Sequence, residues 1–445
     1  MKTILIKNAK LVNEGEIYHA DVYIKGKFIE KIERQGISMH ADMVIEAAGK
    51  YLFPGLIDDQ VHFREPGLTH KGEIYTEAKA AVAGGVTSYM EMPNTIPSAT
   101  TLDLLEDKYA LASHRSLANF SFYMGTTNHN LEELLNVDPV TICGVKIFMG
   151  SSTGDMLVDN PDALENIFKN VETLIATHCE NDPLIKKNQA AYIAEYGENM
   201  PASMHSLIRS EEACYLSSSF AVELAKKHNT RLHILHISTA KELSLFDNKT
   251  PLINKRITAE ACIHHLWFSD KDYAAKGNLI KWNPAIKKES DRDAILKAVS
   301  NNLIDVIATD HAPHTWLEKS QPYLKAPSGG PLVQHSLNTL IQLHKQGKIS
   351  LEKIAEKTAH HVAVLFEIDR RGFIREGYYA DLVLVDMNQN YTINKSNILY
   401  KCGWSPFEGQ QFDSVITHTM VNGNLVYQNG QFDESNTGMR LRFNR

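Results

Sequence analysis

Side chains that can bind a metal ion or move a proton recur directly after short apolar segments of this sequence. Gln60 and His62 stand two residues apart, a spacing that places both side chains on one face of an extended segment. Histidine and aspartate are common metal ligands where several of them converge. The pattern therefore predicts a metal site. Four further candidates each follow an apolar segment in the same way: Lys146, His178, His236 and Asp310.

Lys146 is the most informative of these residues because its ammonium group follows the apolar segment 142–145. Burying an unpaired ammonium group costs free energy. A deprotonated lysine amine can add carbon dioxide and become a carbamate, each of whose two oxygens can bind one metal ion. This reaction converts a buried cation into a bridging anion. We therefore expect a carbamylated lysine at position 146.

Other polar residues near these segments are expected to have supporting roles. His233 precedes His236 on the same expected strand, and histidine pairs occur at 264–265 and 360–361. We expect these histidines to be structural or to support the metal ligands, and Asp58 to orient a ligand.

The composition is that of a globular protein with a small-molecule partner. The 445 residues include 43% hydrophobic and 22% charged residues, which argues against a disordered, collagenous or coiled-coil chain. The net charge of −7 and the lack of a basic run argue against nucleic-acid binding. Five cysteines without C-x-x-C spacing indicate free thiols, so we expect the cytoplasm. Because no apolar segment is long enough for a signal peptide or a membrane span, we expect neither.

Two kinds of pattern divide the chain. Residues 1–53 and 376–445 contain short alternating segments and turn signals such as Asn422-Gly423, which predict the two halves of a small β-sandwich domain. Residues 54–375 alternate apolar β-type segments with helical patterns such as 210–228. This alternation predicts an α/β fold, a (β/α)8 barrel of the TIM type, with the candidate side chains at the carboxyl ends of its strands. The eight expected strands are 52–57, 87–92, 119–124, 141–148, 173–177, 232–236, 256–260 and 305–309.

Longer motifs extend this pattern over essentially the whole chain. They lie at 48–58 (AGKYLFPGLID), 61–67 (VHFREPG), 92–95 (MPNT), 144–154 (GVKIFMGSSTG), 236–239 (HIST), 283–284 (NP), 308–314 (ATDHAPH) and 372–383. With these motifs the chain resembles the amidohydrolase superfamily and, within it, the dihydroorotases. The His-Phe-Arg-Glu-Pro-Gly and Pro-Asn-Thr motifs carry the resemblance to the dihydroorotases.

The resemblance implies a role for each candidate residue. It implies zinc, one or two ions per chain, with position 60 and His62 at the first ion and the carbamate of Lys146 as the bridge. Asp310 would bind metal and act as the catalytic base. The other implied roles are metal ligands for His178 and His236, substrate-carboxylate partners for Arg64, Asn94 and His314, and ring-amide partners for Asn283 and the backbone around Gly329 in 326–330.

Gln60 departs from the family pattern, which has histidine at this position. A carboxamide is a weaker metal ligand than an imidazole. We therefore expect the first metal site to fill weakly or not at all, while the second keeps its ligands.

The function that the resemblance implies is a metal-dependent dihydroorotase. Such an enzyme reversibly cyclises N-carbamoyl-L-aspartate to dihydroorotate with release of water in pyrimidine synthesis. One alternative is a hydantoinase, dihydropyrimidinase or allantoinase, whose ring substrates generally lack the carboxylate that Arg64 would bind. A second alternative, motivated by Gln60 alone, is a non-catalytic dihydroorotase-like scaffold. The expected partners are a small-molecule substrate and either a second copy of the chain or another enzyme of the pathway.

Overall fold

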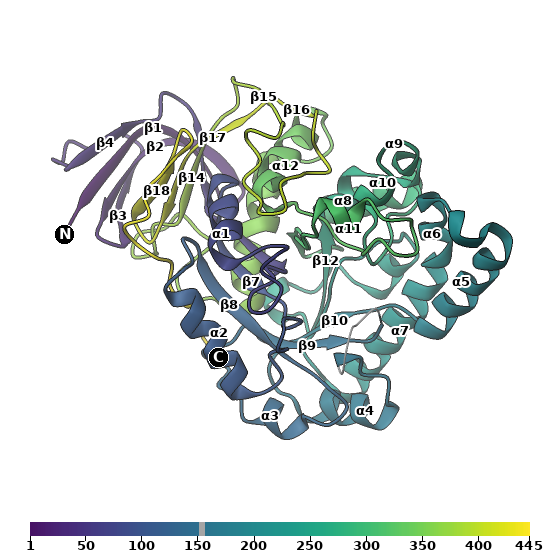
Figure 1. Ribbon diagram of the computed structural model, residues 1–445. Helices are drawn as coiled ribbons and strands as arrows, with labels where there is room; N and C mark the ends of the chain where they lie inside the picture. The colour runs from purple at the N-terminus through teal and green to yellow at the C-terminus, as the bar shows by residue number, and fades with distance from the viewer. Residues whose placement is uncertain (151–155) are drawn as a thin grey trace.

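Eight parallel strands form a barrel in the computed structural model, which describes residues 1–150 and 156–445 (Figure 1). Each strand pairs with the next one along the chain. The backbone N–H of His62 donates to the carbonyl of His311 over 2.7 Å and so connects the ends of the first and last strands. The predicted barrel is confirmed. Its strands are β6 (Leu56–Val61), β7 (Val86–Glu91), β8 (Asn119–Gly125), β9 (Gly144–Phe148), β10 (Ile175–His178), β11 (Leu232–Ile234), β12 (Ile257–Cys262) and β13 (Val306–Ala308).

Helices cover the outside of the barrel, and local sequence signals set their ends (Figure 1). Helix α7 (Glu211–His228) begins after Ser210, whose hydroxyl accepts a hydrogen bond from the backbone N–H of Ala213, and ends before Asn229 in the left-handed conformation. The other α-helices are α1 (Ile74–Ala83), α2 (Leu102–Ser113), α3 (Leu131–Leu135), α4 (Pro161–Asn170), α5 (Asp182–Tyr196), α6 (His205–Ile208), α8 (Ile263–Trp267), α9 (Tyr273–Lys276), α10 (Glu289–Ser300), α11 (Trp316–Lys319), α12 (Ser336–Lys345), α13 (Leu351–Ala355) and α14 (His361–Phe366).

The first barrel strand differs from its predicted position. Residues 52–54 belong to β5 (Tyr51–Pro54), which pairs with strands of the terminal sheet, and β6 starts only at Leu56. The apolar run 52–57 is continuous, so the sequence does not show where the chain passes from one sheet to the other. Residues 58–60 consequently lie inside β6 and not after it.

Strand β6 contains a β-bulge just before its carboxyl end. Asp58 pairs with Tyr89 and Val61 with Glu91, so β6 has one residue more than β7 between these pairs. A bulge of this kind redirects the neighbouring side chains.

A nine-stranded sheet beside the barrel joins the two ends of the chain (Figure 1). Strand β5 pairs with β1 from the N-terminal segment and with β14 from the C-terminal segment. Buried aliphatic side chains from both ends, among them Ile4 and Leu382, pack in one core. The predicted β domain built from both termini is confirmed, and its boundaries at 53 and 375 stay predictions. Its strands are β1 (Thr3–Asn13), β2 (Glu16–Lys25), β3 (Phe28–Glu33), β4 (Met43–Glu46), β5, β14 (Leu382–Asp386), β17 (Val415–Val421), β18 (Asn424–Gln428) and β19 (Gln431–Phe432); β15 (Tyr391–Thr392) and β16 (Gln411–Phe412) form a separate pair.

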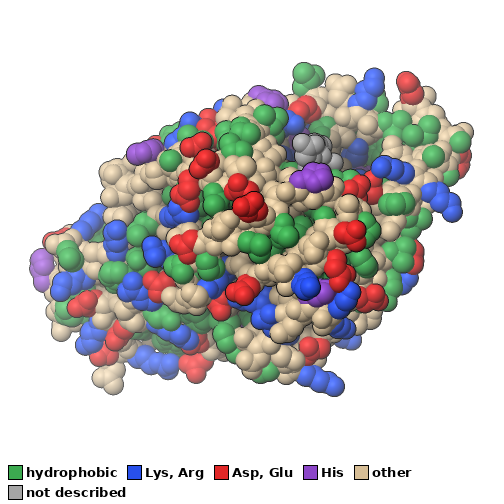
Figure 2. All heavy atoms as spheres, turned by 90° about the horizontal axis from the view of Figure 1, so that it is seen from below, with side chains coloured by type: hydrophobic (Ala, Val, Ile, Leu, Met, Phe, Trp, Pro, Cys, Tyr) green, Lys and Arg blue, Asp and Glu red, His purple; other side chains and the backbone are tan. Residues whose placement is uncertain are grey.

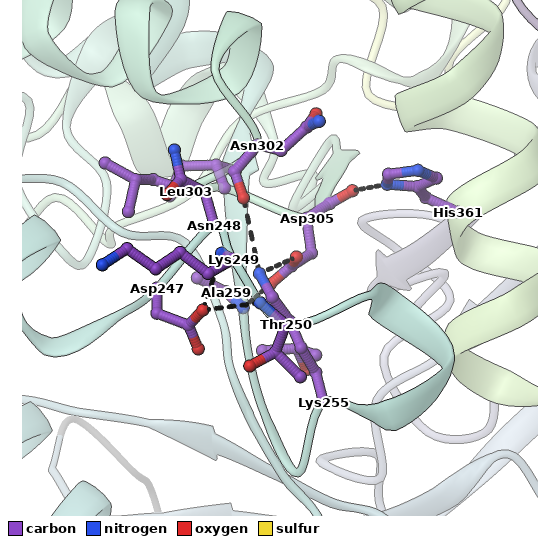
Figure 3. A network of polar contacts seen from close by, with 12 residues as sticks. Asp247, Asn248, Lys249, Thr250, Lys255, Ala259, Asn302, Leu303, Asp305 and His361 are labelled. Carbon is purple, nitrogen blue, oxygen red and sulfur yellow. Dashed lines mark hydrogen bonds and ion pairs between the residues drawn. The ribbon is translucent and has the colours of Figure 1, made fainter.

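A polar network holds the amino-terminal ends of strands β12 and β13 together (Figure 3). Asp305, just before β13, forms a buried ion pair of 2.6 Å with Lys255 and accepts the backbone N–H of Ala259 over 3.0 Å. The ring of His361 donates to the carbonyl of Asp305 over 2.9 Å. This end of a TIM barrel generally serves stability, so the chemistry is expected at the other end.

The distribution of charged side chains on the surface and the state of the cysteines are as the composition predicts. Acidic and basic side chains are interspersed on the face that Figure 2 shows. All five cysteines are free thiols, as their spacing predicts. Within the described ranges, no helix has the length and apolarity needed to span a membrane.

Candidate active site

A cavity of about 650 Å³ opens at the carboxyl ends of the barrel strands. Every residue predicted for the site lines this cavity, although these residues come from strands or loops far apart in the sequence. Their placement together is thus observed, and their individual roles stay predictions. Residues Ser151 to Gly154 of the 144–154 motif lie outside the described residues. The lining includes Gln60, His62, Arg64, Asn94, Lys146, His178, His236, Asn283, Asp310, His314 and Gly329.

His62 and Asp310 form the first pair of candidate ligands. Nε2 of His62 lies 3.3 Å from Oδ1 of Asp310. On the other side of the ring, Nδ1 of His62 lies 2.8 Å from the carboxamide oxygen of Asn94, which accepts its proton. Asn94 therefore leaves the Nε2 lone pair free to bind a metal ion.

Gln60 reaches the same carboxylate with its nitrogen and not its oxygen. Its Nε2 donates to Oδ1 of Asp310 over 3.3 Å, while its Oε1 faces the thiol of Cys262 at 3.6 Å. A carboxamide binds metal ions through its oxygen. In this arrangement Gln60 offers no ligand atom toward Asp310, and the expectation that position 60 is the weak point of the first metal site stays a prediction.

His178 and His236 form the second pair of candidate ligands. Nδ1 of His178 lies 3.0 Å from Nε2 of His236. Nε2 of His178 faces Glu180 at 2.8 Å, and Glu180 is also paired with Arg209. Because the carboxylate accepts the Nε2 proton, Nδ1 of His178 keeps its lone pair toward His236. The sequence interpretation missed Glu180, whose only local signal is its position two residues after His178.

Lys146 interacts electrostatically with both pairs. Its charge lowers the pKa values of His62, His178, His236 and Asp310, so it lies close to all four groups. Burial lowers the pKa of Lys146 itself to about 7. A large fraction of the amine is therefore neutral at physiological pH, as carbamylation requires. The first pair offers a nitrogen and an oxygen, and the second pair offers two nitrogens. With such a lysine near both pairs, the arrangement suits a centre of two metal ions.

Asp310 is suited to exchange protons near neutral pH. Burial raises its pKa to about 7, against the opposing effect of the nearby cationic groups. Asp310 also has a positive φ of 48°, as do His236 at 41° and Arg64 at 70°. Non-glycine residues rarely adopt this conformation, and such strain concentrates at functional sites.

Arg64, Lys71 and His314 form a group of hydrogen-bond donors on the cavity wall. Burial lowers the pKa of Arg64 to about 10, so the guanidinium stays charged near neutral pH. Nζ of Lys71 donates to Nδ1 of His314 over 3.2 Å, which places the ring proton on Nε2, 3.0 Å from the carbonyl of Ser328. Nη2 of Arg64 lies 3.1 Å from this Nε2. Two N–H groups then lie side by side, near the positive charges of Arg64 and Lys71, and this arrangement favours an anionic group bound beside them.

The loop that contains Gly329 is held by a buried lysine that the sequence interpretation also missed. Nζ of Lys319 donates to the carbonyls of Pro327 and Gly329 over 2.9 and 2.7 Å. Gly329 has a φ of 124°, and a Cβ there would lie 2.6 Å from the carbonyl oxygen of Ala312, so only glycine fits. Lys71 and Lys319 look like surface lysines in the sequence, and only the fold shows where they lie.

Comparisons with known proteins identify the family of this chain. A profile of the amidohydrolase family matches residues 51–426. A dihydroorotase from Methanosarcina acetivorans is 31% identical, covering 96% of this chain and 92% of that protein. An allantoinase from Bacillus velezensis is also 31% identical, covering 96% and 94%. The solved L-hydantoinase (dihydropyrimidinase) from Arthrobacter aurescens superposes with a TM-score of 0.94 at 26% identity, covering 99% of this chain and all of that one. The protein is therefore a hydrolase of cyclic amides that belongs to the amidohydrolase family.

Proposed function

We propose that this protein is a dihydroorotase, which interconverts N-carbamoyl-L-aspartate and dihydroorotate. The observation that carries the proposal is the group of donors at Arg64, Lys71 and His314 beside the candidate metal ligands. Dihydroorotate bears a carboxylate that these donors can bind, whereas the rings of hydantoin, allantoin and dihydrouracil carry none. Relatives named dihydroorotase support the same proposal.

The residues that would hold zinc divide between two positions. His62 and Asp310 would hold the first ion and His178 and His236 the second, with the carbamate of Lys146 between them. Bound zinc polarises a carbonyl group and makes water a better nucleophile near neutral pH.

The side chains of the chain supply binding and proton transfer. In hydrolysis, Asp310 takes a proton from the attacking water and passes it to the leaving ring nitrogen, and ring closure uses the same steps in reverse. Arg64, Asn94 and His314 hold the substrate carboxylate. Asn283 and the backbone at Gly329 orient the ring amides, and Lys319 keeps that backbone in position.

A substrate panel tests the proposal. The purified protein is supplied with zinc and bicarbonate and assayed with dihydroorotate, hydantoin, allantoin and dihydrouracil. We expect dihydroorotate to have the highest kcat/KM. A preference for allantoin or a hydantoin would assign the protein to that activity instead, and no turnover of any of them would favour a binding role without catalysis.

The setting of this activity is also a proposal. The five free thiols favour a reducing compartment, so we place the enzyme in the cytoplasm.

A further inference from the structure

Three ionisable side chains meet inside the barrel, beneath the active-site cavity. Asp59 comes from β6, His233 from β11 and Glu260 from β12, and none of the three has any exposed surface. One ligand atom from each lies within 4.8 Å of the others. Nε2 of His233 is 3.2 Å from Oδ2 of Asp59 and 3.8 Å from Oε2 of Glu260. We call these three residues the deep cluster.

The bulge in β6 explains how Asp59 reaches this place. Neighbouring residues of a regular strand point to opposite faces, yet Gln60 contacts Asp310 at the cavity while Asp59 contacts His233 inside the barrel. Strand β6 is not a neighbour of β11 or β12 in the sheet, so the deep cluster spans the interior of the barrel.

The hydrogen bonds around His233 turn its inner nitrogen toward the two carboxylates. The hydroxyl of Thr258 donates to the carbonyl of Leu232 over 3.3 Å, so its oxygen accepts the Nδ1 proton of His233 over 2.8 Å. Nε2 then faces the two carboxylates. Within residues 1–150 and 156–445, neither this Nε2, nor either carboxylate oxygen of Asp59, nor Oε2 of Glu260 makes a hydrogen bond.

The charge of the deep cluster calls for a cation. Burial lowers the pKa of His233, but Asp59 and Glu260 outweigh it and raise that pKa to about 9, so without a metal ion an imidazolium pairs with the two carboxylates. One carboxylate charge is then left uncompensated, and burying uncompensated charge costs free energy. A divalent metal ion in place of the imidazolium proton would neutralise both carboxylates and use all of these atoms as ligands at once.

We propose that Asp59, His233 and Glu260 bind a divalent transition-metal ion such as Zn²⁺, at a site separate from the active-site metal centre. One imidazole nitrogen with two carboxylate oxygens is a ligand set that suits zinc. Ligand atoms around a tetrahedral zinc ion are about 3.4 Å apart, given bond lengths of about 2.1 Å. The separations of 3.2 and 3.8 Å bracket this value.

The ion would have a structural role that supports the active site. It cross-links three strands through the barrel interior. The other carboxylate oxygen of Glu260, Oε1, accepts the backbone N–H of His236 over 2.8 Å, so the site also positions a candidate active-site ligand. The inference does not depend on which cyclic amide the enzyme hydrolyses.

Anomalous diffraction tests the proposal directly. Crystals of the protein purified from zinc-supplemented culture are measured on both sides of the zinc absorption edge. We expect an anomalous peak among Asp59, His233 and Glu260, in addition to density at the cavity. A map with peaks at the cavity and none in the deep cluster would overturn the proposal and leave the three side chains sharing protons.

Metal analysis of variants gives a second, independent test. Asp59→Asn is expected to lose one metal ion per chain relative to the wild type. His178→Ala, which removes an active-site ligand, is expected to keep the deep ion. Glu242→Gln is the matched control, because Glu242 is a buried carboxylate that bonds to the hydroxyls of Ser218 and Thr239. Equal metal content in folded Asp59→Asn and wild-type protein would also overturn the proposal; if Asp59→Asn does not fold, the wild-type anomalous map decides.

Discussion

The side-chain amide of Gln60 donates to Oδ1 of Asp310 over 3.3 Å. This contact uses an oxygen of Asp310 that also faces His62, and it turns the carboxamide oxygen of Gln60 away toward Cys262. At the position where the family resemblance implies a metal-binding imidazole, this chain therefore presents a hydrogen-bond donor to Asp310, a candidate ligand. The proposed first metal site therefore keeps His62, Asp310 and the Lys146 carbamate but lacks the further imidazole that the family resemblance implies at position 60.

Replacing Gln60 with histidine tests whether position 60 limits metal binding at the first site. Gln60→His supplies an imidazole in place of the amide, so we expect the metal content to rise by up to one ion per chain while turnover continues. Elemental analysis after dialysis measures the change. Cys262→Ser, which alters the other neighbour of Gln60 without adding an imidazole, serves as the control. Wild-type protein with two equally tight ions at the active site would contradict the prediction.

Removal of the Lys146 side chain tests the carbamate. Lys146→Ala is expected to lose both active-site metal and activity, because no bridging anion can form. A small added carboxylate such as acetate should restore part of each by occupying the same space. Removal of the buried lysine at 108, which pairs with Glu91 at 3.1 Å, provides a control for the loss of a buried lysine. Unchanged active-site metal in Lys146→Ala would show that the lysine is not a bridge.

Substitution of Arg64 tests recognition of the substrate carboxylate. Loss of a desolvated, charge-assisted contact costs about 2 to 5 kcal/mol, so Arg64→Ala should lower kcat/KM for dihydroorotate by roughly 30-fold to several thousand-fold. Turnover of dihydrouracil, which has no carboxylate, should change little. Equal losses for the two substrates would mean that Arg64 acts on the fold of the site and not on the carboxylate.

Lys71 is expected to contribute to the same recognition. Its Nζ lies 2.9 Å from Oε1 of Glu318 and 3.2 Å from His314, so it helps to set the protonation of that ring. Lys71→Met should raise KM for dihydroorotate about 10-fold or more, since a hydrogen bond that involves a charged group contributes about 1.5 to 3 kcal/mol. Lys79→Met, on the outer helix α1, is the control and should leave KM unchanged. The measurement is steady-state kinetics at saturating zinc.

The ionised carboxylate of Asp310 is expected to lower the free energy of unfolding of the metal-free protein above neutral pH. Burial raises its pKa to about 7 from an ordinary value of 3.8, so the folded state binds an extra proton between these pH values and loses stability as the pH rises through this window. Asp310→Asn carries no charge, so its metal-free form should be more stable than the wild type at pH 8, by at most about 4 kcal/mol for a shift of this size. At pH 4 the gain should nearly vanish. Denaturant unfolding at both pH values measures it, and a gain that is the same at both would contradict the prediction.

The sequence by itself determined the architecture and predicted the candidate residues that line the cavity. Alternating apolar segments predict the barrel because each buried parallel strand needs a short apolar run, and the polar residues after these runs are carried to one end of the barrel. Lys146, His178, His236 and Asp310 could be found in this way because each lies in or close after an apolar strand: Lys146 is inside β9, His178 ends β10, and His236 and Asp310 come two residues after β11 and β13. The two ends of the chain likewise carry the alternating pattern of a shared sheet.

The tertiary structure decided what local patterns do not encode. The bulge in β6 depends on pairing with β7, and it is the bulge that separates the environments of Asp59 and Gln60. The proton positions on His62 and His178 depend on Asn94 and Glu180, whose roles arise from contacts and not from spacing. Lys319 and Lys71 look solvated in the sequence, but long-range packing brings them to the cavity loop and the cavity wall. Such contacts join residues far apart in the chain, so they form and stabilise the site only once the barrel has closed.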